Sequence, residues 1–208
     1  MSDRVYPLLS ISFIVLALIL TPAQAEENTR SSAAKNTESI VLAGGCFWCI
    51  ESDYEKLNGV INVVSGYSGG DSHNANYKQV SAGNSGHIEV VEVTYNPHII
   101  THAQILEYFW RHIDPTRDDG QFCDRGPQYR PAIFYKNDIE KQAILKSAAN
   151  IEKIKTFKEP LKVEFIQARA FYPAEDYHQD YYKKNPVRYN YYRYSCGRDA
   201  RVDELWGS

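Results

Sequence analysis

The order of the periodic segments along the chain constrains the fold more than any other feature. Apolar runs of strand length and segments with helical spacing follow one another as strand, helix, strand, strand, helix, strand. This order is typical of a split βαβ unit, in which helices pack on one face of a mixed sheet. We therefore predict an α+β protein with a ferredoxin-like, two-layer core. The six segments are 40–43, 46–57, 60–66, 88–95, 102–112 and 131–135.

The rest of the chain predicts one further strand and two helices, without an internal repeat or a second domain. The last helix follows Pro173 and ends before Pro186, because proline removes a backbone donor and breaks a helix interior. All predicted elements belong to a single domain over 39–208. The additional elements are a helix over 138–154, a strand over 162–167 and a short helix over 174–184.

Two long connections interrupt these elements, over residues 66–86 and 113–130. The first is rich in Gly, Ser and Asn. Loops of this length inside a compact domain are often functional. We therefore expect long functional loops that carry part of the site.

The first 25 residues are typical of a secretory signal peptide. Arg4 precedes an apolar run from Leu8 to Leu20, and a small-residue pattern ends at Ala25. This run is shorter than the roughly 20 residues that a membrane-spanning helix needs, so we expect cleavage rather than an uncleaved N-terminal anchor. The sequence thus predicts an exported, periplasmic protein with a flexible polar linker over 26–38.

Charge and cysteine spacing argue against two classes of function. The formal net charge is −3 and no basic face dominates, so we do not expect binding to nucleic acid. Cys46 and Cys49 form one close pair, while Cys123 and Cys196 stand alone. A structural zinc site needs a second close pair of ligands, so we expect neither a metal nor another cofactor.

Cys46 is the leading candidate for a reactive residue. The apolar segment 40–43 runs through two glycines into this cysteine, which opens the predicted helix. Free backbone N–H groups and the helix dipole stabilise a thiolate at such a position, and the thiolate is the nucleophile. The alternative is an inert, buried structural cysteine.

Glu89 is the second candidate, because the period of two in segment 88–95 places it on the face of Val91, Val93 and Tyr95. Burial on that face would raise the pKa of the carboxyl group and keep it protonated as a proton donor. The alternative is an edge position, where Glu89 reaches solvent past the end of the strand.

An ordered set of motifs runs through the chain from residue 39 to residue 207. Gly45-Cys46-Phe47-Trp48 comes first. It is followed by Gly66-Tyr67-Ser68-Gly69-Gly70, Tyr77 within Asn-Tyr-Lys-Gln-Val, Gly86-His87-Ile88-Glu89, Asp114-Pro115-Thr116 and Asp124-Arg125-Gly126-Pro127-Gln128-Tyr129-Arg130. In these motifs the chain closely resembles the peptide methionine-S-sulfoxide reductases, the MsrA family.

The resemblance implies an enzyme that reduces methionine-S-sulfoxide in proteins, peptides and free methionine, as repair after oxidative damage. Cys46 would attack the sulfoxide sulfur while Glu89, as a neutral acid, protonates the sulfoxide oxygen. Tyr77 and Tyr129 would donate hydrogen bonds to that oxygen. The products would be methionine and a sulfenic acid on Cys46.

The same resemblance implies three more residues around the reacting sulfur. Phe47 and Trp48 would form the apolar wall that accepts the methyl group, and Asp124 would orient the site from its loop. By residue type alone, Phe47 and Trp48 would be core aromatics. We assign His178 to hydrogen bonding or the surface, and the tyrosines of segment 189–194 to packing.

A second thiol must resolve the sulfenic acid, and the chain offers three. Cys196, in Tyr-Ser-Cys-Gly-Arg, matches the C-terminal resolving position of the family and is the first choice. Cys49 is the second, because C-x-x-C pairs readily form disulfides, and Cys123 beside Asp124 is the third. The resemblance implies that a thioredoxin-like reductant then reduces the disulfide. A glycine-rich tail with two cysteines, seen in some relatives, is missing, which argues against a longer thiol relay.

Two other functions remain open at this point. A thioredoxin-like disulfide oxidoreductase would use Cys46 and Cys49 at the strand-to-helix turn, without a role for Glu89. A non-catalytic binder of oxidised proteins would retain Cys46 for structure. We expect the chain to act as a monomer.

Overall fold

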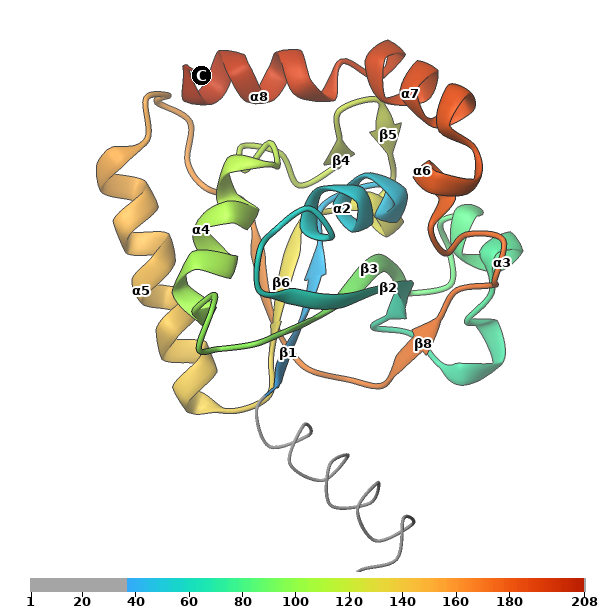
Figure 1. Ribbon diagram of the computed structural model, residues 1–208, viewed down its shortest axis with the longest axis horizontal. Helices are drawn as coiled ribbons and strands as arrows, with labels where there is room; N and C mark the ends of the chain where they lie inside the picture. Colours follow the sequence, from blue (N-terminus) through green and yellow to red (C-terminus); the bar gives the residue numbers. More distant parts are fainter. Residues whose placement is uncertain (1–36, 208) are drawn as a thin grey trace, which may run out of the picture. The chain divides into compact units, whose positions relative to one another are not determined.

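The computed structural model describes residues 37–207, which form a six-stranded sheet with helices and a separate two-stranded hairpin (Figure 1). The predicted signal peptide and most of the predicted linker lie outside the described residues. The strand order is β7-β6-β1-β3-β2-β8. The strands are β1 (Glu38–Ala43), β2 (Val60–Ser68), β3 (Ile88–Tyr95), β6 (Ala132–Tyr135), β7 (Glu164–Gln167) and β8 (Phe171–Pro173).

The four central strands have the connectivity of a split βαβ unit. β3 lies between β1 and β2 and is antiparallel to both, so that Val91 pairs with Leu42 on one side and Ser65 on the other. β6 is antiparallel to β1 and parallel to β7, which makes the sheet mixed. The predicted α+β class with a ferredoxin-like split βαβ core is therefore confirmed.

Three helices pack on one face of this sheet (Figure 1). Strand periodicity explains the choice of face, because Ile40, Leu42, Val91 and Val93 share one buried cluster with residues of these helices. Intervening residues such as Val90 form a separate cluster. Within residues 37–207, no helix has the length and apolar character needed to cross a membrane. The three helices are α2 (Phe47–Tyr54), α4 (His102–Arg111) and α5 (Asp138–Ile154).

The two long connections contain short elements that residue periodicity does not reveal. In the first, β2 continues to Ser68 before the chain leaves the sheet. In the second, a hairpin with a two-residue turn precedes a short 3-10 helix. These elements are η1 (Ser72–Asn74), α3 (Tyr77–Ser81), β4 (Gly120–Gln121), β5 (Asp124–Arg125) and η2 (Pro127–Tyr129).

The C-terminal segment differs from the sequence prediction. The helix predicted over 174–184 forms only its last turn, because Gln179 binds both the N–H and the carbonyl oxygen of Ser65 instead of facing solvent on a helix. Two helices that we did not predict follow. Pro186 opens the first, and Gly197, with a φ of 68°, separates it from the second. The helices are α6 (Tyr181–Lys184), α7 (Pro186–Ser195) and α8 (Arg198–Trp206).

Candidate active site

Cys46 stands at the turn between β1 and α2. β1 ends at Ala43, and two glycines lead to Cys46, which occupies the N-cap position of α2. Gly45 has a φ of 86°, and a Cβ atom at this position would lie 2.6 Å from Cβ of Gln121. A residue with a side chain would therefore be strained here, so glycine allows the close turn that brings Cys46 against the β4–β5 hairpin.

The structure brings seven of the predicted site residues together around one cavity of about 80 Å³. They come from the start of α2, the start of α3, β3, β5 and η2, which are far apart in the sequence. Tyr192 of α7 also lines the cavity, although we had assigned it to packing. The seven residues are Cys46, Phe47, Trp48, Tyr77, Glu89, Asp124 and Tyr129.

The Cys46 side chain is a protonated thiol. It is 7% exposed, and burial raises its pKa well above that of a free cysteine, with smaller contributions from Cys49, Glu89 and Asp124. The start of α2 does not offset this rise in the pKa of Cys46, because the Phe47 N–H donates to Glu89 and not to the Cys46 sulfur. Burial therefore opposes the stabilisation of a Cys46 thiolate that we expected from the start of α2.

Glu89 is buried on the helix-covered face of β3, with 2% of its surface exposed. Burial is the largest influence and raises the pKa of its carboxyl group to about 8, so that Glu89 is neutral at pH 7. The Phe47 N–H donates to Oε2 at 3.1 Å. The proton therefore belongs on Oε1. The alternative in which Glu89 reaches solvent past the strand end is wrong.

Tyr77 and Tyr129 bring two phenol groups to the cavity. Burial is the main cause that raises the pKa of both, so both hydroxyls remain protonated and can donate hydrogen bonds. Glu175 holds Tyr77 in place, because its Oε1 accepts the Tyr77 N–H at 2.9 Å. Its Oε2 accepts the Tyr67 hydroxyl at 2.8 Å. Sequence analysis did not assign this supporting role to Glu175.

Phe47 and Trp48 are fixed by a histidine that we did not place in the site. The Trp48 indole N–H donates to His178 Nδ1 at 3.1 Å, and the Trp48 ring stacks on Tyr181 with centroids 3.7 Å apart. Burial lowers the pKa of His178, which favours the neutral ring that this hydrogen bond requires. The His178 ring lies 5.0 Å from Phe47 and 4.4 Å from Tyr77, measured between centroids. His178 thus supports the whole aromatic wall.

Asp124 is held between the β4–β5 hairpin and α7. It pairs with Gln121 across the hairpin, and its Oδ2 accepts the Tyr192 hydroxyl at 2.5 Å. Burial raises the pKa of the Asp124 carboxyl group, while this hydrogen bond acts in the opposite direction. Asp124 and Tyr192 therefore form one wall of the cavity as a unit.

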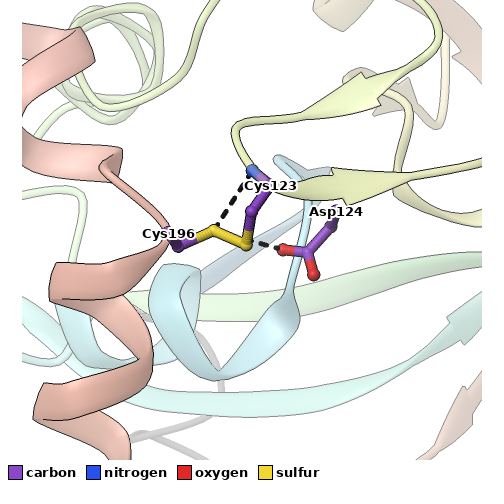
Figure 2. A group of neighbouring side chains, drawn as sticks. All are labelled: Cys123, Asp124 and Cys196. Atoms are coloured by element: carbon purple, nitrogen blue, oxygen red, sulfur yellow. Dashed lines mark hydrogen bonds between the residues drawn. A yellow bond between two sulfur atoms is a disulfide. The ribbon is translucent and has the colours of Figure 1, made fainter.

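Cys123 and Cys196 form a disulfide (Figure 2). Cys46 and Cys49 are free thiols. The first-choice resolving cysteine is thus joined to the third choice. Cys196 Sγ lies 4.0 Å from Asp124 Oδ2 and accepts the Cys123 N–H at 3.2 Å. Although these three residues place potential ligand atoms within 4.8 Å of one another, both sulfurs are in the disulfide and offer no thiolate to a metal.

This arrangement suits the reduction of an oxygen bound to sulfur. The Cys46 sulfur is a nucleophile for an electrophilic sulfur atom, and the neutral Glu89 supplies a proton to the oxygen that leaves. The phenols add hydrogen bonds to the same oxygen. Phe47 and Trp48 offer an apolar surface for a small alkyl group. A cavity of about 80 Å³ restricts what enters to a small end of a larger molecule.

Comparisons with known proteins point to the same chemistry. The sequence model of the family described as "Peptide methionine sulfoxide reductase" matches residues 38–208. A Vibrio cholerae protein described as "Peptide methionine sulfoxide reductase MsrA/MsrB" is 54% identical over 202 residues, which are 97% of this chain and 53% of that protein. The present chain therefore spans about half the length of that relative.

Two further relatives match over most of their own length. "Peptide methionine sulfoxide reductase MsrA" of Bacillus licheniformis is 41% identical over 174 residues, or 84% of this chain and 96% of that protein. Among solved structures, Mxr1 from Saccharomyces cerevisiae in reduced form aligns with a TM-score of 0.69 and 32% identity. That alignment covers 73% of this chain and 87% of Mxr1.

Proposed function

Because this chain belongs to the peptide methionine sulfoxide reductase family, we propose that it reduces methionine-S-sulfoxide to methionine in oxidised proteins and peptides, and in free methionine. The observation that carries the proposal is the placement of the Cys46 thiol, the neutral Glu89 and two protonated phenols around one small cavity. This activity would repair proteins after oxidative damage.

The proposed reaction transfers one oxygen and two electrons. Cys46 attacks the sulfoxide sulfur, and Glu89 protonates the sulfoxide oxygen while Tyr77 and Tyr129 donate hydrogen bonds to it. The attack joins the Cys46 sulfur to the methionine sulfur. The protonated oxygen then passes to the Cys46 sulfur, and both the sulfur–oxygen bond of the substrate and the new sulfur–sulfur bond break. The methionine sulfur is thereby reduced, and Cys46 becomes a sulfenic acid. The proton that Cys46 gives up restores the neutral carboxyl group of Glu89, so the protons balance.

Substrate orientation follows from the two walls of the cavity. The methyl group of the sulfoxide lies against Phe47 and Trp48, and the oxygen points toward Glu89 and the phenols. Exchanging oxygen and lone pair on sulfur, as in the R epimer, would direct the oxygen away from these donors. The apolar wall and the polar wall together therefore select the S epimer.

A reduction assay with separated S and R epimers of methionine sulfoxide, with dithiothreitol as reductant, tests this proposal. We expect methionine from the S epimer and at least about 100-fold less from the R epimer, because losing the donors to a developing charge costs about 3 kcal/mol. Cys46→Ser should abolish turnover. Glu89→Gln should lose activity only in part, since the amide still donates a hydrogen bond. Equal rates for both epimers would contradict the orientation.

We further propose a thioredoxin-like dithiol protein as the physiological reductant. Support comes from the Cys123–Cys196 disulfide, since a disulfide formed during turnover must be reduced before the next cycle. Turnover with thioredoxin, its reductase and NADPH should consume one NADPH for each methionine formed. Methionine production without NADPH consumption would contradict this assignment.

A thioredoxin-like disulfide oxidoreductase is the second candidate, because Cys46 and Cys49 interact directly. Their burial, with 7% and 2% exposed, opposes it, since a protein disulfide would have to reach both sulfurs. The protein should therefore reduce insulin at the background rate of dithiothreitol alone. Faster insulin reduction that survives Glu89→Gln would support the oxidoreductase instead.

Export to the periplasm also remains a proposal, supported by the signal-peptide pattern of residues 1–25. Cell fractionation with N-terminal sequencing should find a periplasmic protein that begins at Glu26. A full-length chain in the membrane fraction would indicate an uncleaved anchor.

We also propose a monomer as the active unit, because a single chain is sufficient to place the nucleophile, the acid and both phenols around the cavity. Light scattering after size exclusion should give the mass of a single chain. A stable dimer at micromolar concentration would contradict this.

A further inference from the structure

The Cys123–Cys196 disulfide joins the turn of the β4–β5 hairpin to the end of α7 (Figure 2). On the cavity side, Cys196 Sγ lies 4.0 Å from Asp124 Oδ2, and Asp124 lines the same cavity as Cys46. Cys196 also follows α7, one turn after Tyr192, another residue of that cavity. Its sulfur is therefore at the margin of the site.

Cys123 occupies the opposite side of this disulfide. It stands in the two-residue turn of the β4–β5 hairpin and is exposed, whereas Cys196 is half-buried and Cys46 is buried. Hydrogen bonds hold the hairpin in addition to the disulfide. Gln121 of β4 accepts the Asp114 N–H and donates to the Asp114 carbonyl oxygen, both at 2.8 Å. Cys123 is thus presented to solvent on a fixed turn.

Exposure therefore increases along the series Cys46, Cys196, Cys123. We propose that Cys123 is a second resolving cysteine, which moves the oxidising equivalents from the buried cavity to the surface. This inference rests on the proposed reductase activity. In this relay, a cysteine on the β4–β5 hairpin takes the place of the tail cysteines seen in some relatives. The relay also explains why the disulfide links Cys196 to Cys123 while Cys46 is a free thiol.

The steps balance as follows. The Cys196 thiol attacks the sulfenic acid on Cys46, which forms a Cys46–Cys196 disulfide and releases water. The Cys123 thiolate then attacks the Cys196 sulfur, which forms Cys123–Cys196 and returns Cys46 as a thiolate that takes up the proton lost by Cys123. An external dithiol attacks the exposed Cys123 sulfur, leaves as a disulfide, and restores the two thiols of Cys123 and Cys196.

Counting methionine in the absence of reductant tests the relay. All variants also carry Cys49→Ala, so that Cys49 cannot form a disulfide, and the protein with this change alone is the background protein. Each protein is fully reduced at the start and receives an excess of methionine-S-sulfoxide. We expect two methionines for each protein, because the relay frees Cys46 for a second attack. Adding Cys123→Ser should lower the yield to one, with Cys46 locked to Cys196. Adding the exposed neighbour change Ser195→Ala instead should leave the yield at two.

Peptide mapping identifies the disulfides in the same samples. The background protein should contain Cys123–Cys196, and the Cys123→Ser protein should contain Cys46–Cys196. Two methionines from the Cys123→Ser protein, or one from the background protein, would overturn the relay. Either result differs from failure of the reductase itself, which would give no methionine in any sample. The first methionine from each variant also shows that it is folded.

Discussion

Glu89 holds the proton on which the proposed reaction depends. Its pKa of about 8 has one dominant cause, burial on the helix-covered face of β3, which outweighs the hydrogen bond from the Phe47 amide. The ordinary carboxyl pKa is about 4.3, so in most proteins a glutamate cannot donate a proton at neutral pH. The position of this residue in the sheet thus determines its chemistry.

The protonation of Glu89 can be measured directly. Infrared difference spectra between wild type and Glu89→Gln should show the carbonyl band of a protonated carboxyl group at pH 6 and pH 7. Because the raised pKa is that of an acid, the neutral form exists below it, and the band should fade as the pH rises through about 8. A carboxylate signal for Glu89 already at pH 6 would refute the neutral acid.

The hydrogen bond between the Trp48 indole and His178 should contribute to substrate binding. His178→Phe removes the acceptor and keeps a ring, and loss of a hydrogen bond costs about 1 kcal/mol. We expect KM for the sulfoxide to rise roughly fivefold, with kcat changed less than about twofold, because the bond positions the wall and not the reacting atoms.

A double-mutant cycle provides the control for this bond. Trp48→Phe removes the donor, so the double variant should lose less than the sum of the two single losses. Additive losses would show that the two side chains act independently and that His178 does not position Trp48.

Residue types and motif order identify those site residues whose chemistry is distinctive. A cysteine after two glycines and a glutamate on an apolar strand face can be interpreted from the sequence, and the family resemblance adds Tyr77 and Tyr129. The supporting residues give no such signal. His178 meets Trp48 across 130 positions, and its contact depends on how the C-terminal segment folds back. Sequence spacing cannot reveal such a contact.

At the scale of elements, the turn from β1 into α2 fixes where the Cys46 thiol lies. Gly45→Ala adds a Cβ atom 2.6 Å from Gln121 at a φ of 86°. Left-handed backbone alone costs a residue with a side chain about 1–2 kcal/mol, and the contact with Gln121 adds to it. We expect the free energy of unfolding in urea to fall by roughly 2–4 kcal/mol.

Gly197→Ala is the matched control for this substitution. Gly197 also has a positive φ, 68°, but a Cβ atom there has no neighbour within 4 Å. It should therefore lose only the backbone contribution, about 1–2 kcal/mol. Equal losses for the two variants would show that close approach to the hairpin does not determine the turn.

Hydrophobic periodicity in the sequence predicts the strands and helices that form the core, but it does not predict the elements that surround the site. Alternation along β3 and helical spacing in α5 arise from burial on one face, which leaves a visible period in the sequence. The C-terminal helices depend on distant partners. Arg198 of α8, for example, donates to the carbonyl oxygens of Gly44 at 3.2 Å and His112 at 2.8 Å. Contacts of this kind produce no periodic pattern in the sequence.

At the scale of the whole molecule, the split βαβ core could be predicted because element order leaves few ways to connect four strands. The same core explains the site. The β1–α2 turn brings Cys46 next to β3, which lies beside β1 in the sheet and carries Glu89. The loops and the C-terminal helices then close the cavity around this pair. Nucleophile and acid therefore depend on the fold core, whereas selectivity and recycling depend on the segments around it.

In the proposed reaction, Cys46 takes the oxygen from methionine-S-sulfoxide. The most direct measurement uses Cys49→Ala/Cys123→Ser/Cys196→Ser, which retains Cys46 alone, with one equivalent of the S epimer and a reagent that traps sulfenic acids. Mass spectrometry should find one methionine for each protein and one trapped adduct on Cys46. Methionine formed in that amount without an adduct on Cys46 would show that another group accepts the oxygen.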